Sequence, residues 1–167
     1  MKTIVETLLR QTGRVNIDKL LSIMERHGYY SVPSNGHHKS YAGTLNHSLE
    51  VLLYALKHNE HNVSKDSLII VCLLHDLCKI HGYRHIGGHG RRSVKLIQDV
   101  AQVRLESDEY YAIKYHMKKS AGMVKKYTKN YMRVINSLLW QLICKADSYS
   151  ASSEITKQEL IQKLQDL

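Results

Sequence analysis

No run of apolar residues in this sequence is long enough to cross a lipid bilayer. The longest uninterrupted run extends from Leu68 to Leu74, whereas a membrane-spanning helix needs roughly 18 or more apolar residues. The segment that follows Met1 lacks the apolar core of a signal peptide, because Glu6 and Arg10 interrupt it. We therefore expect a cytoplasmic protein with no membrane partner.

Cysteine is scarce, and its spacing offers no pairs. The chain has three cysteines, Cys72, Cys78 and Cys144, an odd number without any C-x-x-C motif. Neither a disulfide framework nor a zinc site built from thiolates fits that arrangement. We expect three free thiols, and a structural zinc protein becomes a weak alternative.

Proline and strand-like alternation are also rare. Pro33 is the one proline, and we find no low-complexity tract or internal repeat. Few segments alternate apolar and polar residues for long enough to form strands. Helical periodicity is common instead, as in the stripe of Leu45, Leu49, Leu52 and Leu56. The sequence therefore predicts an all-α fold.

The same periodicity locates the expected helices. Ser64 is suited to cap the helix that contains the apolar run, and Ser107 a later one, each with acidic residues in the first turn. Because the run is apolar nearly all round, its helix should be central and buried. The prediction is a single all-α domain over residues 1–167, a bundle of six or seven helices near 17–28, 45–56, 64–74, 91–104, 107 onward, 135–146 and 160–167.

Acidic residues are missing from one basic stretch. The formal net charge is +9, and residues 114–133 contain seven basic side chains and no acid, whereas the rest of the chain is nearly balanced. Such a local field attracts anionic ligands. Tyr115, Tyr127 and Tyr131 are interleaved with the lysines, and cations beside aromatic rings suit phosphates and stacked bases. Charge alone favours the simpler interpretation of a solvated face.

The strongest local signal is the string Leu-Leu-His-Asp-Leu-Cys-Lys at residues 73–79. It places His75 and Asp76 directly after the apolar run. Burial of an unpaired carboxylate costs several kcal/mol, so Asp76 needs a strong partner. A metal ion and an arginine both fit, and the pair by itself is equally consistent with a hydrogen-bonded structural role.

Two further positions favour the metal. His47 lies early in the preceding predicted helix, and Asp147 lies near the end of a late one, on the face that we expect to point inward. The order His, His-Asp, Asp on three helices, together with the 73–79 string that ends in Lys79, resembles the HD-domain superfamily of metal-dependent phosphohydrolases. The resemblance covers about residues 37–150.

Two more histidines extend the resemblance. His89 lies in Gly-His-Gly-Arg-Arg-Ser, and His116 lies in Ala-Ile-Lys-Tyr-His-Met. Both strings are similar to those of small bacterial and phage HD-domain hydrolases and of HD-class diadenosine tetraphosphate hydrolases, where the corresponding pair supports a second metal. Relatives often carry an acidic residue at the position of Arg91, a departure that bears on the substrate and not on metal binding. His85 is the alternative to His89 as a ligand.

The resemblance implies one or two divalent transition-metal ions as cofactor. The implied ligands are His47, His75, Asp76 and Asp147 for the first ion, and Asp76, His89 and His116 for the second. Mixed nitrogen and oxygen donors suit manganese, iron, nickel or zinc better than magnesium or calcium. Asp76, shared by both ions, and Lys79, which would stabilise charge on a phosphate, are the predicted catalytic residues. A surface salt bridge is the alternative role for Lys79.

The leading functional hypothesis is a metal-dependent phosphohydrolase, in which metal-activated water cleaves a phosphoester or phosphoanhydride of a nucleotide-like substrate. Three substrate classes are open: nucleotides including dinucleoside polyphosphates, cyclic nucleotides or oligonucleotides, and single-stranded nucleic acid. The alternative is an HD-like module that senses a nucleotide or RNA without turnover. The predicted substrate-binding residues are Lys79, Arg91, Arg92, Lys118 and Lys119.

Overall fold

Helices are the only regular elements in the part of the chain that the computed structural model describes, which is residues 1–32, 43–81, 88–118, 120–152 and 155–165. The predicted all-α class is confirmed. In chain order, the elements are α1 (Lys2–Gln11), α2 (Ile17–Arg26), α3 (Gly43–Lys57), α4 (Lys65–Leu74), the 3-10 helix η1 (Leu77–His81), α5 (His89–Lys95), the π-helix η2 (Leu96–Val100), α6 (Ser107–Tyr115), α7 (Ala121–Lys125), α8 (Tyr131–Asn136), α9 (Leu138–Ser150) and α10 (Lys157–Gln165). None of these helices combines the length and the apolar character needed to span a membrane.

The predicted number of helices was too low. Ten α-helices lie in the described residues, against the six or seven expected. Two of the additional ones, α7 and α8, have five and six residues, which is too short for an apolar stripe to stand out. The third, α1, buries Val5 and Leu9, and two positions do not define a periodic pattern.

The helix expected over 91–104 is shorter and less regular than predicted. It begins as α5, which ends at Lys95, and continues as the π-helix η2 to Val100. Gln102 then has a φ of 60°, in the left-handed region that cannot continue a right-handed helix. Apolar spacing alone did not reveal this change of winding.

Of the two predicted caps, one lies at the expected position and one is displaced. Ser64 is the N-cap residue of α4, although its side chain makes no capping hydrogen bond. The cap expected at Ser107 lies one residue earlier, where Glu106 and Glu109 form a reciprocal capping box and the Glu106 backbone N–H donates to Glu109 Oε2 at 2.8 Å. Two carboxylates at a helix N-terminus satisfy free N–H groups and also favour the helix dipole.

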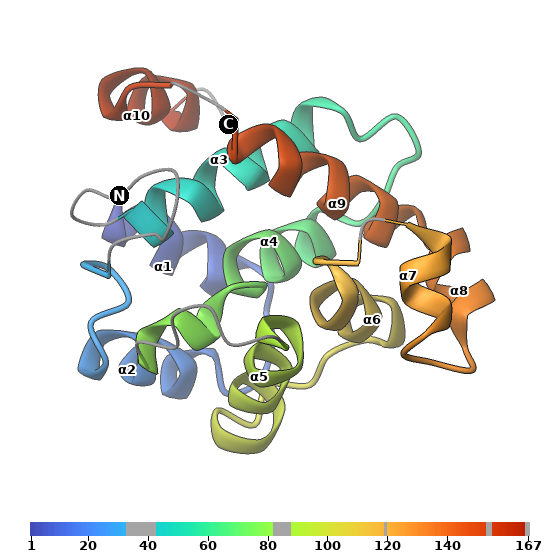
Figure 1. The fold of residues 1–167 in the computed structure, drawn as a ribbon. Helices are drawn as coiled ribbons and strands as arrows, with labels where there is room; N and C mark the ends of the chain where they lie inside the picture. The colour runs from blue at the N-terminus through green and yellow to red at the C-terminus, as the bar shows by residue number, and fades with distance from the viewer. Residues whose placement is uncertain (33–42, 82–87, 119, 153–154, 166–167) are drawn as a thin grey trace.

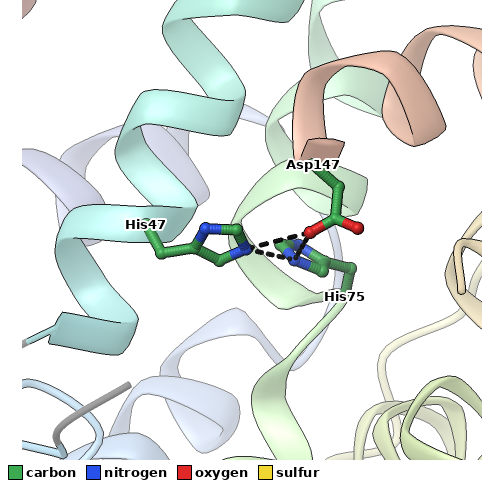
Figure 2. Close-up of side chains that lie close together, drawn as sticks. All are labelled: His47, His75 and Asp147. Carbon is green, nitrogen blue, oxygen red and sulfur yellow. Dashed lines mark hydrogen bonds and ion pairs between the residues drawn. The ribbon is translucent and has the colours of Figure 1, made fainter. Parts of the chain in front are cut away.

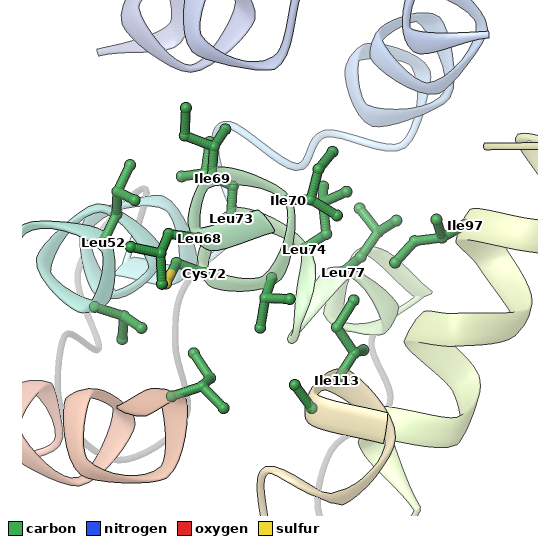
Figure 3. Packing of buried hydrophobic residues seen from close by; sticks show 14 of the residues in the cluster. Leu52, Leu68, Ile69, Ile70, Cys72, Leu73, Leu74, Leu77, Ile97 and Ile113 are labelled. Atoms are coloured by element: carbon green, nitrogen blue, oxygen red, sulfur yellow. The ribbon is translucent and has the colours of Figure 1, made fainter. Parts of the chain in front are cut away.

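The α4 helix lies at the centre of the fold, as its composition predicts (Figure 1). It packs against α3, α9, α6 and α1. All seven residues from Leu68 to Leu74 are buried, and Figure 3 shows six of them among apolar side chains that include Leu52, Ile97 and Ile113. Because buried apolar area stabilises by roughly 25 cal/mol per Å², this cluster holds the end of α4 firmly in place.

The N-terminal residues, which the family resemblance does not cover, pack against the same core. Leu9 of α1 and Met24 of α2 are completely buried. Tyr29 is also completely buried, and its hydroxyl donates to the backbone oxygen of Leu73 at 2.7 Å, in the last turn of α4. The N-terminal segment therefore helps to hold the position from which His75 follows.

Candidate metal centre

Three elements bring two histidines and an aspartate together in the interior. His47 lies on α3, His75 directly follows α4 and Asp147 lies on α9, and Figure 2 shows their side chains converging. Nε2 of His47 is 3.2 Å from both Nε2 of His75 and Oδ1 of Asp147. All three residues are buried, and one ligand atom from each lies within 4.8 Å of the others. This spacing allows the three atoms to share one metal ion.

Local helix geometry explains why these side chains point inward. Asp147 lies four residues after Ile143 and seven after Trp140, and all three are buried on one face of α9. Nearly all of the first ten residues of α3 are buried, and His47 is among them. His75 occupies the C-cap of α4, so the apolar helix delivers it directly to the interior.

Asp76 connects this group to a third histidine. Its Oδ2 lies 3.6 Å from Nε2 of His75 and 3.9 Å from Nε2 of His47. Its Oδ1 lies 3.7 Å from Nε2 of His116, at the end of α6. His75, Asp76 and His116 form a second buried group with metal-ligand spacing. The two oxygens of one carboxylate thus face different histidines, which is the geometry that a bridging ligand requires.

Hydrogen bonds to backbone carbonyls set the tautomers of two histidines. Nδ1 of His75 lies 2.9 Å from the oxygen of Cys72, and Nδ1 of His116 lies 2.7 Å from the oxygen of Ile113. A carbonyl oxygen can only accept, so both Nδ1 atoms carry the proton. Each histidine is the C-cap of its helix and bonds the carbonyl three residues earlier, one of those that a helix end leaves without an intrahelical partner.

The tautomer of His47 is set by a relay of side chains. Ser150 Oγ donates to Glu50 Oε2 at 2.8 Å, so it accepts the N–H from Nδ1 of His47, 2.9 Å away. All three residues are buried. A carboxylate behind a metal-binding histidine orients the ring and raises its basicity; in this protein a serine hydroxyl stands between the two.

These hydrogen bonds leave three Nε2 lone pairs directed at one another and at two carboxylates. Nε2 of His116 is buried and, among the described residues, has no hydrogen-bond partner. Nε2 of His47 and Nε2 of His75, both acceptors, lie 3.2 Å apart. Acceptors at this distance repel one another unless a cation lies between them. The donor set therefore fits a divalent ion, and its mixed nitrogen and oxygen character suits manganese, iron, nickel or zinc.

The protonation states of the site residues also suit the binding of a divalent metal ion. Burial disfavours the protonated imidazole and lowers the pKa of His75 to about 4. Burial also acts to raise the pKa of Asp76, but the neighbouring histidines and Lys79 outweigh it and hold the pKa well below its usual range. Burial also acts to raise the pKa of Asp147, and the neighbouring histidines, in their protonated form, lower it below its usual range. At neutral pH the site thus presents ionised carboxylates and a neutral His75, the forms that bind metal.

His89, predicted as a ligand of a second ion, lies at the edge of this cluster. It is the first residue of α5 and half-buried, with Nδ1 3.6 Å from Sγ of Cys78. It belongs to neither of the two ligand groups found among the described residues. Of the neighbouring predicted residues, Arg91 is exposed and Arg92 is half-buried. His85, the alternative ligand, lies outside the described residues.

The predicted lysines divide between the centre and the surface. Nζ of Lys79 lies 2.6 Å from Oδ2 of Asp76, with the Lys79 side chain 16% exposed, so the residue belongs to the centre itself. Lys118 lies two residues after His116, and its Nζ is 4.1 Å from the centroid of the Tyr127 ring. Lys119 lies outside the described residues.

The sequence reasoning missed Glu50 and Ser150. The available signal was spacing, because Glu50 follows His47 by three residues and Ser150 follows Asp147 by three. Residues three apart share a helix face, so an acid and a hydroxyl placed one turn after predicted ligands are candidates for supporting them.

Comparison with known proteins gives one family. The family model of the HD domain matches residues 44–152, a segment that contains both ligand groups. No curated protein matches the chain, and no solved structure does.

Proposed function

The chain belongs to the HD domain family of metal-dependent phosphohydrolases, and from this premise we propose that it hydrolyses a phosphoester or phosphoanhydride of a nucleotide-like substrate. The observation that carries the proposal is the convergence of three Nε2 lone pairs and two carboxylates in one buried cluster. A purely structural histidine pair has no need of two further buried ligands, Asp147 and His116, at metal-ligand spacing.

The ligand atoms divide into two overlapping sets. His47, His75 and Asp147 would hold one ion, His116 would bind a second, and Asp76 would contribute an oxygen to each set. When bound, such ions lower the pKa of water and draw charge from phosphate oxygens. Asp76 is suited to serve both sets, because its two oxygens point toward different histidines.

Lys79 is suited to orient both the Asp76 carboxylate, as a metal ligand, and the phosphate of the substrate. Its ammonium pairs with Oδ2 of Asp76, which holds that carboxylate in position and ionised. An ammonium has three donors, so others are available for a phosphate oxygen or for the charge that develops on a leaving group. This role accounts for a lysine at the edge of a buried cluster.

Metal content and turnover test the proposal. Purified protein is expected to carry about one to two transition-metal ions per chain, and to hydrolyse bis(p-nitrophenyl) phosphate or nucleotides when manganese, iron, nickel or zinc is supplied. Asp76→Asn should reduce turnover by orders of magnitude and weaken the binding of both ions. Asp66→Asn is the matched control, since Asp66 lies exposed in the first turn of α4, the helix that ends just before His75 and Asp76.

The outcomes separate the enzyme from its main alternative. Metal binding and nucleotide binding without turnover under any of the four metals would identify a sensing module. Absence of metal together with full activity of Asp76→Asn would contradict the metal centre altogether.

The number of ions is tested separately. Replacement of His116 by alanine should lower metal occupancy and turnover while the His47, His75 and Asp147 set keeps its ion. Full activity of that variant would leave a one-ion centre.

A further inference from the structure

The segment from Met117 to Leu138, which begins directly after His116, holds most of the large hydrophobic side chains that are exposed among the described residues. Eight large hydrophobic side chains are exposed among the described residues. Five of them lie in this segment: Met117, Met123, Tyr127, Met132 and Leu138. Exposed apolar groups concentrated in one segment make it a candidate interaction surface.

The same segment gathers positive charge around its tyrosines. Lys118 lies over the ring of Tyr127, and Lys125 lies over the ring of Tyr131 at 5.6 Å. An open hollow of about 510 Å³ is lined by lysines, tyrosines and a threonine, namely Lys125, Lys126, Tyr127, Thr128, Lys129 and Tyr131. We call these six residues, together with Lys118, the basic–aromatic face. No acidic residue occurs anywhere in 114–133.

This face is anchored to the core beside His116. Val124 of α7 and Val134 of α8 are completely buried in the hydrophobic core, so both short helices are anchored to the body of the fold. The Tyr115 hydroxyl donates to the backbone oxygen of Tyr127 at 3.4 Å, and the Lys118 backbone N–H donates to the oxygen of Tyr115 at 2.8 Å. The residue before His116 therefore ties the face to the candidate centre.

A ligand for this face must supply both negative charge and flat apolar rings. Lysines bind phosphates, and exposed tyrosine rings stack on bases. Tyr127 is 61% exposed despite its contact with Lys118, so ring surface is available for a base. Bases in a duplex are already stacked and paired, whereas those of a single strand are free to stack on protein.

We propose that the basic–aromatic face binds a single-stranded oligonucleotide and delivers it to the metal centre, so that the substrate class is oligonucleotide rather than free nucleotide. The inference rests on the proposed hydrolase function for its catalytic half. Its binding half stands on the face alone and is testable without metal.

Binding is measured by fluorescence anisotropy, in chelator, with a labelled single strand of about 12 nucleotides, within the site sizes typical of such surfaces. The strand should bind more tightly than a mononucleotide or a duplex of equal length. Replacing Lys125, Lys126 and Lys129 by glutamine should weaken binding roughly ten-fold at low salt, and should make the slope of log K against log salt shallower by about two. Tyr127→Leu keeps apolar bulk and removes the ring, and should cost roughly five- to hundred-fold in affinity.

The matched control removes the same charge elsewhere. Arg26, Lys57 and Lys163 are exposed on α2, α3 and α10, and their glutamine variant should keep both the affinity and the salt slope of the wild type. With metal restored, the lysine variant should raise the KM for the oligonucleotide more than it lowers kcat. Equal losses in the control and in the lysine variant would overturn the face as the binding surface.

Failure of the two proposals looks different. If bis(p-nitrophenyl) phosphate is hydrolysed but the single strand does not bind, the oligonucleotide inference is wrong and the hydrolase stands. If the strand binds as described but no phosphodiester or nucleotide is cleaved under any metal, the hydrolase is wrong and the binding face stands. Binding to vesicles that contain phosphatidylserine, with none to the single strand, would overturn the inference in favour of a membrane surface.

Discussion

At the scale of single residues, two histidines at helix ends are oriented by the same kind of hydrogen bond. His75 and His116 are both C-cap residues that donate from Nδ1 to the carbonyl three positions earlier. This hydrogen bond satisfies a backbone acceptor and also fixes Nε2 as a lone pair directed into the centre. His47 lies in the interior of α3, where carbonyls are already paired, and it depends on Ser150 and Glu50 instead.

Ser150→Ala tests that dependence. The substitution leaves the N–H of His47 and the carboxylate of Glu50 without the hydroxyl that joins them, so metal affinity should fall by about 10–100-fold. Competition titration against a chromogenic chelator measures the change. Ser148→Ala is the control, because Ser148 Oγ bonds the Cys144 carbonyl within α9, and its affinity should match the wild type. Equal affinities for all three proteins would contradict the relay.

The pKa of His75 predicts how stability depends on pH. Folding lowers that pKa from 6.5 to about 4, so between these values the unfolded chain binds a proton that the folded chain does not. The free energy of unfolding of metal-free protein should therefore be highest above pH 6.5 and fall as pH decreases, by up to about 3 kcal/mol near pH 4. Below pH 4, the lowered pKa values of Asp76 and Asp147 continue the loss in the same direction.

Urea unfolding in chelator, from pH 7 to pH 4, measures this dependence. His75→Asn should show a shallower decline over the upper part of the range, because it removes the imidazole that resists protonation. A wild-type stability that is flat or rising as the pH falls would contradict a neutral, buried His75.

At the scale of elements, the critical contact is that between α5 and α6. Gly90, the second residue of α5, is buried against the end of α6. A Cβ at this position would overlap the backbone oxygen of Ile113 and lie 2.6 Å from that of Lys114. The Ile113 oxygen is also the acceptor for Nδ1 of His116. The absence of a side chain at Gly90 thus brings α5, with His89, close to the end of α6, which presents His116.

Gly90→Ala should therefore disturb the centre as well as the fold. Backbone atoms must move to admit the methyl group, at a cost of about 1–3 kcal/mol in the free energy of unfolding, and occupancy of the ion held by His116 should fall. Gly122→Ala is the control, because nothing lies within 4 Å of its Cβ position in α7, and it should be neutral or stabilising by up to about 1 kcal/mol. Thermal melts and metal analysis of both variants provide the comparison, and equal behaviour would show that the α5–α6 contact is not limiting.

At the scale of the whole molecule, the N-terminal segment joins the body of the fold through a buried charge. Nη2 of Arg14 lies 2.6 Å from Oε1 of Glu109, whose side chain is 1% exposed. Ser67 Oγ donates to the same carboxylate oxygen at 2.8 Å. One acid on α6 therefore holds together the α1–α2 connection and the first turn of α4.

Arg14→Leu should destabilise the protein strongly. The variant keeps apolar bulk but leaves the Glu109 carboxylate buried without its cation, which costs about 3–5 kcal/mol. Arg10→Leu is the control, because Arg10 pairs with the highly exposed Asp18 at the surface, where ion pairs contribute little. Pairing Arg14→Leu with Glu109→Gln should recover much of the loss, since no buried charge remains. Chemical denaturation of the wild type, the two arginine variants and the double variant measures these differences. Comparable losses of unfolding free energy for the two arginine variants would contradict the buried pair.

The sequence by itself determined the helical class, the central position of α4 and the family. These follow from local properties: apolar residues at helical spacing, a continuous apolar run and the Leu-Leu-His-Asp-Leu-Cys-Lys string at 73–79. The sequence did not predict the short helices α7 and α8, because they have too few residues to show a periodic apolar stripe. The π-helical winding of η2 and the cap at Glu106 were not predicted either, since the spacing of apolar residues indicates neither feature.

Only the tertiary structure decided which groups meet. Periodicity indicates the inward face of a helix and not what lies opposite it, so the relay from His47 through Ser150 to Glu50 joins residues 100 or more positions apart without a local signature. The same holds for the two oxygens of Asp76, which face different histidines, and for the close approach of Gly90 to α6. Residue types specified a metal-binding chemistry, but packing around α4 set the distances and lone-pair directions on which that chemistry depends.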